Sequence, residues 1–233
     1  MNPFITKNCM NLTALWHCYG AKKENDLWFS TDWPHRVWHD SLAKTVTLHG
    51  LQKSQLNPKQ QLVMLDSCNG QRDQLPEGLK ADVSLTLMHL LVSESCQSLR
   101  PGSDLEWLAR DDELGIQAFV EMCSEGFGYP MDIAPLQRCA EKAGGKLGFL
   151  RSSGERVATV LLFQQGSTLG VYQVAVPNIH RGKGYASEVM RHCILWAQEH
   201  EVELITLQAS EMGLSLYRRL GFQEVGSITL WRK

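Results

Sequence analysis

Residues 181–186 read Arg-Gly-Lys-Gly-Tyr-Ala and lie between an apolar run, Val171 to Val176, and a long amphipathic segment. Apolar residues recur at helical spacing after the second glycine, which predicts a helix from about Gly184 to the region of His200. The first turn of such a helix has backbone N–H groups without intrahelical partners and carries partial positive charge. Because small residues let an anion approach this backbone closely, the stretch predicts a strand, a phosphate-binding loop and a helix.

Two other kinds of phosphate-binding loop share part of this pattern. A Walker A loop requires Ser or Thr directly after Gly-Lys, whereas Gly184 follows Lys183 and offers no hydroxyl for magnesium. A Rossmann loop has Gly or Ala where this chain has Ser187, and its glycines follow the strand directly, whereas residues 177–181 intervene here. Glu203 is placed well for a ribose-binding carboxylate, so an NAD-binding oxidoreductase is kept as a third alternative.

The loop resembles motif A of the GNAT superfamily of acyl-CoA-dependent N-acyltransferases, whose pattern is Arg/Gln-x-x-Gly-x-Gly/Ala. Arg181, Gly184 and Ala186 occupy the defining positions. Residues 216–222, Leu-Tyr-Arg-Arg-Leu-Gly-Phe, resemble motif B, in which a Leu-Tyr pair ends a short helix and Leu-Gly-Phe turns into the next strand. The resemblance covers about residues 103–233 and implies an acyltransferase.

The resemblance implies a GNAT fold of the α/β (α+β) class, with a mixed, mostly antiparallel, twisted sheet flanked by helices. We predict two parts, joined by a linker at residues 98–103. Residues 103–233 form the GNAT acetyltransferase domain, and residues 1–100 form a smaller N-terminal α/β region that resembles a degenerate GNAT-like half-domain in size and order. The elements expected in the larger part are strands at 105–109, 147–151, 157–164, 171–176 and 203–208, and helices at 113–122, 133–142 and 184–200.

The N-terminal hundred residues contain no glycine loop after a strand and no Leu-Tyr turn, so their elements rest on local patterns alone. We expect a short helix at residues 11–20 with Asn11 as its cap, and a segment at 82–92 that is either strand or helix. Further strands are expected at 27–30, 37–39, 45–49 and 61–66. Four of the seven tryptophans predict a small aromatic core rather than a ligand cage: Trp16, Trp28, Trp33 and Trp38.

The resemblance also implies how particular residues act. In the family the pantetheine arm of acetyl-CoA pairs with the strand before the loop, where a backbone N–H at Val174 or Ala175 would polarise the thioester carbonyl. Tyr217 stands at the place of the motif B tyrosine, which is the general acid for the departing thiolate. The implied cofactor-binding residues are Val174, Ala175, Val176, Arg181, Gly182, Lys183, Gly184, Tyr185, Ala186 and Ser210.

The chain departs from the family pattern at two places. The strand at 171–176 contains no carboxylate that could act as general base. Glu125 and Asp132 are the other carboxylates that could face the amine, and the general base is left unassigned. Ser210 and Gly213 stand where motif B commonly has Asn and Ala.

The expected function is transfer of an acetyl group from acetyl-CoA to a primary amine, by direct attack in a ternary complex. The alternative is a non-catalytic acyl-CoA-binding module with a sensing or structural role, which the missing carboxylate and the altered motif B favour. The acceptor is expected to be a small-molecule or peptide amine of unknown identity, and the resemblance allows a homodimer.

The composition argues against several other classes of protein. A formal net charge of -2 argues against binding to nucleic acid or to a membrane through a polybasic surface. The longest apolar run, Leu85 to Val92, is too short to span a bilayer, and residues 1–4 do not begin a signal peptide, so a cytoplasmic protein is expected. No metal site is predicted, because no cysteines form a CxxC pair or stand at zinc spacing. Seven are expected to be reduced: Cys9, Cys18, Cys68, Cys96, Cys123, Cys139 and Cys193.

Overall fold

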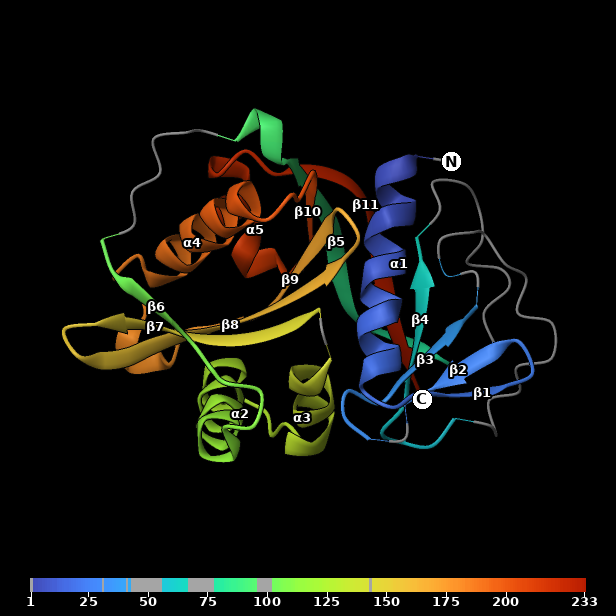
Figure 1. The fold of residues 1–233 in the computed structure, drawn as a ribbon. Helices are drawn as coiled ribbons and strands as arrows, with labels where there is room; N and C mark the ends of the chain where they lie inside the picture. Colours follow the sequence, from blue (N-terminus) through green and yellow to red (C-terminus); the bar gives the residue numbers. More distant parts are fainter. Residues whose placement is uncertain are drawn as a thin grey trace.

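The computed structural model describes residues 2–30, 32–40, 42, 56–66, 78–95, 102–142 and 144–233. Within these ranges the strands form one sheet, in the order β1-β2-β3-β4-β11-β5-β10-β9-β8-β7-β6 (Figure 1). The strands are β1 (Lys22–Glu24), β2 (Leu27–Phe29), β3 (Arg36–His39), β4 (Gln61–Leu65), β5 (Lys80–Leu91), β6 (Asp104–Trp107), β7 (Gly145–Ser152), β8 (Glu155–Gln165), β9 (Thr168–Ala175), β10 (Leu204–Ala209) and β11 (Gln223–Arg232). The helices are α1 (Pro3–Cys18), α2 (Glu113–Phe127), α3 (Ile133–Glu141), α4 (Tyr185–Glu199) and α5 (Glu211–Arg219), with short 3-10 turns η3 (Val92–Glu94) and η4 (Asn178–His180).

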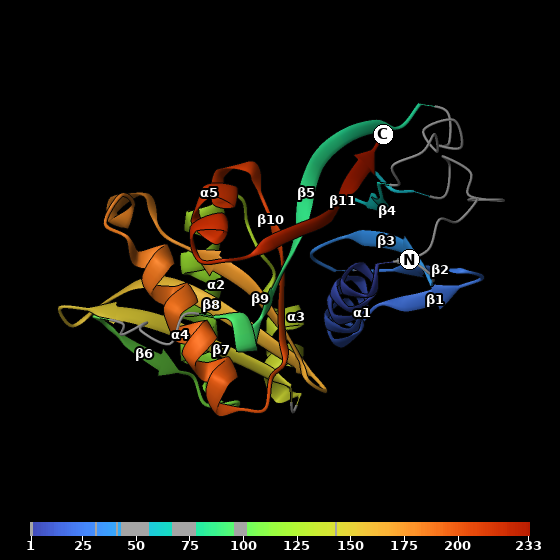
Figure 2. The ribbon, with the colours of Figure 1, turned by 90° about the horizontal axis from the view of Figure 1, so that it is seen from above.

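The helices cover both faces of the sheet and enclose two cores. On one face α1, α2 and α3 pack over the sheet, and the core there includes Leu15, Phe119 and Leu136. On the other face α4 and α5 pack over β5 and β7 to β10, and Val189 and Ile194 of α4 are buried there (Figure 2). The apolar stripe read from the sequence is therefore the face of α4 that the sheet buries.

Most of the expected elements are confirmed within two to five residues of the predicted ends. The helix expected at 113–122 runs on to Phe127, because the chain reverses only at Gly128, which has the left-handed φ of 76°. The segment expected at 82–92 as strand or helix is the strand β5. The strand expected at 45–49 lies outside the described residues.

The first helix ends before Gly20 as predicted, but its predicted start and cap were wrong. The helix α1 starts at Pro3 rather than near residue 11, and Asn2 is its N-cap, since the Asn2 side chain accepts a hydrogen bond from the Phe4 N–H at 2.9 Å. Asn11 is not a cap but a buried residue in the middle of the helix, and its side-chain amide donates to the Phe163 carbonyl at 3.1 Å. Asn11 was therefore mistaken for a cap because asparagine is common at helix starts, whereas its side chain binds the sheet.

The strand β5 joins the two parts of the chain into one sheet. It pairs antiparallel with β10 on one side, Leu91 opposite Leu204, and antiparallel with β11 on the other, Lys80 opposite Arg232. In Figure 2 this strand runs from the N-terminal part into the middle of the C-terminal part. The division into residues 1–100 and 103–233 stays a proposal about the order of the sequence, since in space the two parts share a continuous sheet.

The aromatic cluster predicted for the N-terminal part is present, and two of its members, Trp16 and Trp33, also border a cavity. Trp16, Trp33 and Trp38 are buried, and Trp28 packs against the same cluster while remaining partly exposed. The described cysteines are free thiols. Within the described ranges no helix has the length and apolar content needed to cross a membrane.

Candidate functional site

The glycine loop between β9 and α4 leaves its backbone open. Gly182 and Gly184 have φ values of 76° and 82°, in the left-handed region that favours glycine. A Cβ added at either glycine would meet no atom within 4 Å, so the space beside both is free for a ligand. Gly184 is also the N-cap of α4, and its carbonyl accepts the N–H of Ser187 at 2.9 Å. The helix therefore begins where the sequence predicted, with its positive end at the glycines.

Arg181 fixes the loop to its surroundings. Its Nε donates to the Val176 carbonyl at 3.1 Å, and its Nη2 donates to the Gly126 carbonyl at 2.5 Å. A Cβ at Gly126 would lie 2.9 Å from the Cβ of Ala175, so glycine is what allows the end of α2 to approach the end of β9. The guanidinium thus ties the loop, β9 and α2 together while keeping its positive charge next to the glycines.

The strand before the loop has one open edge. The parallel pairing of β9 with β10 covers Thr168 to Gly170, and no further pairs join these two strands in the part of the chain that the structure describes. Beyond it β9 contains a bulge at Gln173, which has a φ of 51° and whose carbonyl accepts the Thr159 hydroxyl at 2.8 Å. The predicted residues Val174, Ala175 and Val176 follow this bulge, next to the point where β9 and β10 diverge.

Tyr217 lies in α5, across this gap from β9. Its ring is half-buried and contacts Phe222, with 5.8 Å between the ring centroids. Burial, with a smaller effect from Cys193, raises the pKa of Tyr217 to about 12. The ring lies over Gly213, where an added Cβ would be 2.8 Å from its Cε2. Ser210 is the N-cap residue of α5 and is exposed.

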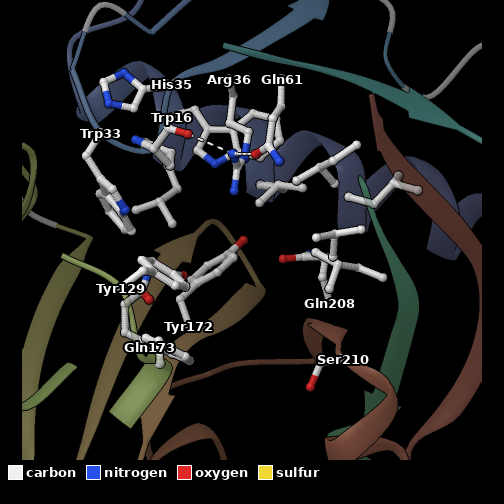
Figure 3. Close-up of a pocket in the computed structure, with 18 of the residues that line it drawn as sticks. Trp16, Trp33, His35, Arg36, Gln61, Tyr129, Tyr172, Gln173, Gln208 and Ser210 are labelled. Atoms are coloured by element: carbon white, nitrogen blue, oxygen red, sulfur yellow. Dashed lines mark hydrogen bonds between the residues drawn. The ribbon is translucent and has the colours of Figure 1, made fainter. Parts of the chain in front are cut away.

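These residues border a cavity of about 1040 Å³ that reaches from the C-terminal part to the N-terminal part (Figure 3). Its lining includes Val174, Arg181, Ser210 and Tyr217, which the sequence predicted. The other predicted residues do not line this cavity: Ala175 and Val176 lie at the end of β9, and Gly182, Lys183, Gly184, Tyr185 and Ala186 belong to the loop and the start of α4. No individual residue of the N-terminal wall was predicted to belong to the site. This wall is formed by Leu12, Leu15, Trp16, Tyr19, Trp33, Pro34, His35, Arg36, Lys59, Gln61, Asp82, Val83 and Leu85.

Two buried hydrogen bonds fix one side of the cavity. The Tyr172 hydroxyl donates to the Asn11 side-chain oxygen at 2.6 Å, and the Gln208 side-chain amide donates to the Asn8 side-chain oxygen at 2.6 Å. Burial raises the pKa of Tyr172 far above its ordinary value, so its hydroxyl stays protonated. Both contacts join α1 to the two strands that diverge, and no local motif could have indicated them.

The two carboxylates considered as general base lie in different places. Glu125 is exposed on α2 and is not part of the cavity lining. Asp132 lines the cavity, but its Oδ2 accepts the backbone N–H of Trp33 at 3.1 Å. The Asp132 carboxylate therefore holds the Trp33 segment against α3, and the base stays unassigned.

Arg36 is the partly buried cation of the N-terminal wall, whereas Lys59 of the same wall is exposed. Arg36 stands on β3, opposite Gln61 of β4, and its Nη1 donates to the Pro34 carbonyl at 2.7 Å and to the Gln61 side-chain oxygen. Burial lowers the pKa of Arg36 to about 10, so it is still protonated at neutral pH. One sequence pattern points to the cavity position of Arg36. Arg36 and the core residue Trp38 are two residues apart on one strand, so their side chains lie on the same face of the sheet.

The splayed strands, the open glycine loop and the helix behind it define a class of fold that solved structures share. A GCN5-related N-acetyltransferase from Kribbella flavida matches with a TM-score of 0.70 at 15% identity, over 100% of this chain and 96% of its own. A GCN5-related N-acetyltransferase from Sphaerobacter thermophilus matches with a TM-score of 0.58 at 18% identity, over 75% of this chain and 59% of its own. The protein therefore has the fold of the GCN5-related N-acetyltransferases, its N-terminal part included.

The C-terminal part of the sequence matches one family model. Residues 139–224 match the acetyltransferase (GNAT) domain, whose members are acyltransferases. This match spans β8, β9, the glycine loop, α4, β10 and α5, which are the elements around the open edge. No curated protein matches the chain in sequence.

Proposed function

We propose that the protein transfers an acetyl group from acetyl-CoA to a primary amine by direct attack in a ternary complex. The observation that carries this proposal is the open edge of β9, which lies between a glycine loop and Tyr217 and borders a cavity large enough for an acceptor. The backbone of Gly182 and Gly184 and the positive end of α4 would hold the phosphates. The N–H groups on β9 after the bulge would bind the pantetheine arm as a neighbouring strand does.

Acetyl-CoA supplies the acetyl group as a thioester. A backbone N–H of Val174 or Ala175 would donate to the carbonyl oxygen while the amine nitrogen forms its bond to the carbonyl carbon. As the carbon–sulfur bond breaks, the Tyr217 hydroxyl would donate its proton to the leaving sulfur, and water would return a proton to the phenolate. The nitrogen loses its extra proton to water, directly or through a base that stays unassigned.

The test begins with calorimetric titration of the protein with acetyl-CoA and, separately, with NAD. We expect micromolar affinity for acetyl-CoA, about 8 kcal/mol, and none for NAD. Gly184→Glu places bulk and negative charge in the loop and should abolish binding. Gly166→Glu is the matched control, because Gly166 also has a positive φ and open space but lies in the turn between β8 and β9. Affinity for NAD instead of acetyl-CoA would overturn the proposal.

Turnover separates the enzyme from its alternative, a module that holds acyl-CoA without reacting it. The alternative is favoured by the absence of a carboxylate on β9 and by the engagement of Asp132 with the Trp33 amide. Thiol release is measured with acetyl-CoA alone and with a panel of amines. Amine-dependent release that Tyr217→Phe lowers by roughly 10- to 100-fold, with unchanged affinity for acetyl-CoA, would support the enzyme. Binding without release from any amine would support the module.

A further inference from the structure

The N-terminal wall of the cavity holds a cation whose hydrogen-bond partners are neutral. Arg36 donates to a backbone carbonyl and to the Gln61 side chain, and no ion pair joins it to a carboxylate among the residues that the structure describes. Burial lowers the pKa of Arg36, while Tyr129 and, to a smaller extent, the carboxylate of Asp82 raise it slightly. The Asp82 Oδ1, however, pairs with Arg232 at 2.8 Å, and its Oδ2 accepts from Gln61. The nearby carboxylate is therefore already occupied by other partners.

The cavity as a whole carries an excess of positive charge. Four basic side chains, those of Arg36, Lys59, Arg181 and Arg232, and two acidic ones, those of Asp82 and Asp132, line it. Its formal net charge is therefore +2, in a chain whose net charge is -2. A ligand with an ammonium group and no anionic group would be repelled from such a cavity, because charges in a partly buried site are weakly screened.

Arg36 is placed to contact the end of a bound amine molecule that lies away from the reacting nitrogen. Figure 3 shows it on the N-terminal wall, across the cavity from Tyr172 and Gln173 on β9. The reacting amine must approach β9, where the thioester carbonyl would lie, so a second group on the same molecule can reach Arg36 from inside the cavity. A partly buried guanidinium such as that of Arg36 binds carboxylate and phosphate oxygens through charge-assisted hydrogen bonds.

We propose that the acceptor is a primary amine that also carries an anionic group, a carboxylate or a phosphate, and that Arg36 binds this group and so determines which amines are accepted. The inference rests on the proposed acetyl transfer and adds to it the class of substrate. Since Trp16 and Trp33 of the same wall are aromatic and buried, an aromatic amino acid is included among the probes.

The experiment uses three matched pairs of amines with the complete chain. The pairs are phenylalanine with phenylalaninamide, γ-aminobutyrate with γ-aminobutyramide, and phosphoethanolamine with ethanolamine. Binding of each is measured by calorimetry on the protein saturated with CoA, which does not depend on turnover, and KM and kcat are measured with acetyl-CoA. We expect at least one anionic member to bind roughly 10- to 100-fold more tightly than its partner without an anionic group, and the pair concerned tells carboxylate from phosphate.

Three variants assign the effect to Arg36. Arg36→Met removes the charge and should raise the Kd and KM of the preferred anionic amine by roughly 10- to 100-fold, without raising the values for its partner that lacks the anionic group. Arg36→Lys keeps the charge without the fork of N–H donors and should show a smaller loss. Lys22→Met is the control, since Lys22 is an exposed cation on β1 that does not line the cavity, and it should leave the preference unchanged. Acetyl-CoA affinity and circular dichroism verify that each variant is folded.

The two proposals fail in different ways. If no amine is acetylated but an anionic amine still binds in an Arg36-dependent manner, acetyl transfer is overturned and the anion site stands. If amines are acetylated without preference for anionic members, or if Arg36→Met raises the KM of both members of a pair equally, the anion site is overturned. The same conclusion follows if no anionic member of the panel binds while acetyl-CoA does.

Discussion

The contact between Gly213 and Tyr217 shows how a single residue determines the position of a side chain in this site. Motif B was expected to carry alanine at position 213, and the chain has glycine. The ring of Tyr217 occupies the space that an alanine side chain would need, because a Cβ there would lie 2.8 Å from Cε2. Glycine therefore allows the phenol to lie closer to the helix than it otherwise could.

We expect Gly213→Ala to move the ring of Tyr217 and to lower kcat by roughly 10-fold, if Tyr217 is the general acid. The affinity for acetyl-CoA should not change, since the glycine loop is untouched. The thermal midpoint should not fall either, because alanine favours the helical conformation of α5 by up to about 1 kcal/mol over glycine. The comparison is steady-state kinetics beside a thermal melt.

Gly102→Ala is the control for this substitution, because a Cβ at Gly102 would meet no atom within 4 Å. It should leave kcat unchanged. An unchanged kcat in Gly213→Ala as well would show that the position of the Tyr217 ring does not limit the reaction.

The residues that sequence motifs mark are the ones that could be predicted. The structure finds Gly184 at the start of its helix, as predicted, because a glycine with positive φ and a helix behind it leave a local signature. It places Tyr217 at the cavity, beside the gap after β9. Arg36 and Gln61 leave no such signature, since their meeting depends on the pairing of β3 with β4 across a long stretch of chain. Long-range pairing is what local patterns do not encode.

The helix α1 also shows that long-range contacts escape prediction from local sequence patterns. Its two buried asparagines bind backbone groups of the sheet: Asn8 donates to the Met88 carbonyl at 3.0 Å and to the Leu207 carbonyl at 3.1 Å, and Asn11 donates to the Phe163 carbonyl. Asparagine is a common helix cap, and this is why Asn11 was predicted as the start of the helix. The tertiary contact outweighed the local preference.

We expect Asn8→Ala to lower the free energy of unfolding by about 1–3 kcal/mol, because it removes donors from two buried carbonyls and the partner of the Gln208 amide. Chemical denaturation followed by tryptophan fluorescence measures the change. Lys7→Ala is the control on the same helix, since Lys7 is exposed, and it should have little effect. Equal stability of the two variants would show that these hydrogen bonds do not hold α1 on the sheet.

Because β5 belongs to the N-terminal part but pairs with strands of the C-terminal part, we expect the two parts to fold together. A fragment of residues 102–233 contains every motif of the GNAT domain but lacks β5, which pairs with both β10 and β11. We expect this fragment to aggregate or to unfold without a cooperative transition, because its central strands keep unpaired edges. Adding residues 78–95 as a separate peptide should restore a cooperative transition. A fragment that melts cooperatively alone would show that β5 is dispensable for this part of the fold.

The buried thiols predict how stability depends on pH. Burial raises the pKa of both Cys9 and Cys123 from 9.0 to about 12. The unfolded chain therefore loses these protons near pH 9, while the folded protein keeps them until near pH 12. The stabilising effect is complete below pH 9 and is lost as the pH rises from 9 to 12, by about 1.4 kcal/mol per thiol at pH 10.

Chemical denaturation at pH 8 and pH 10, under reducing conditions, measures this loss. Cys9→Ala removes one of the four buried thiols among the described residues, which also include Cys139 and Cys193, and should show a smaller decrease between the two pH values than the unaltered protein. A free energy of unfolding that is the same at both pH values would contradict the expected linkage.

The position of β5 also determines when the fold can be completed during synthesis. The ribosome makes Lys80–Leu91 before it makes either neighbour, since Leu204–Ala209 and Gln223–Arg232 lie over a hundred residues further along the chain. Until those strands emerge, β5 is an exposed strand with two free edges in the nascent chain. Folding during translation therefore waits for β11, and a nascent chain that stalls before residue 223 presents a surface that chaperones recognise.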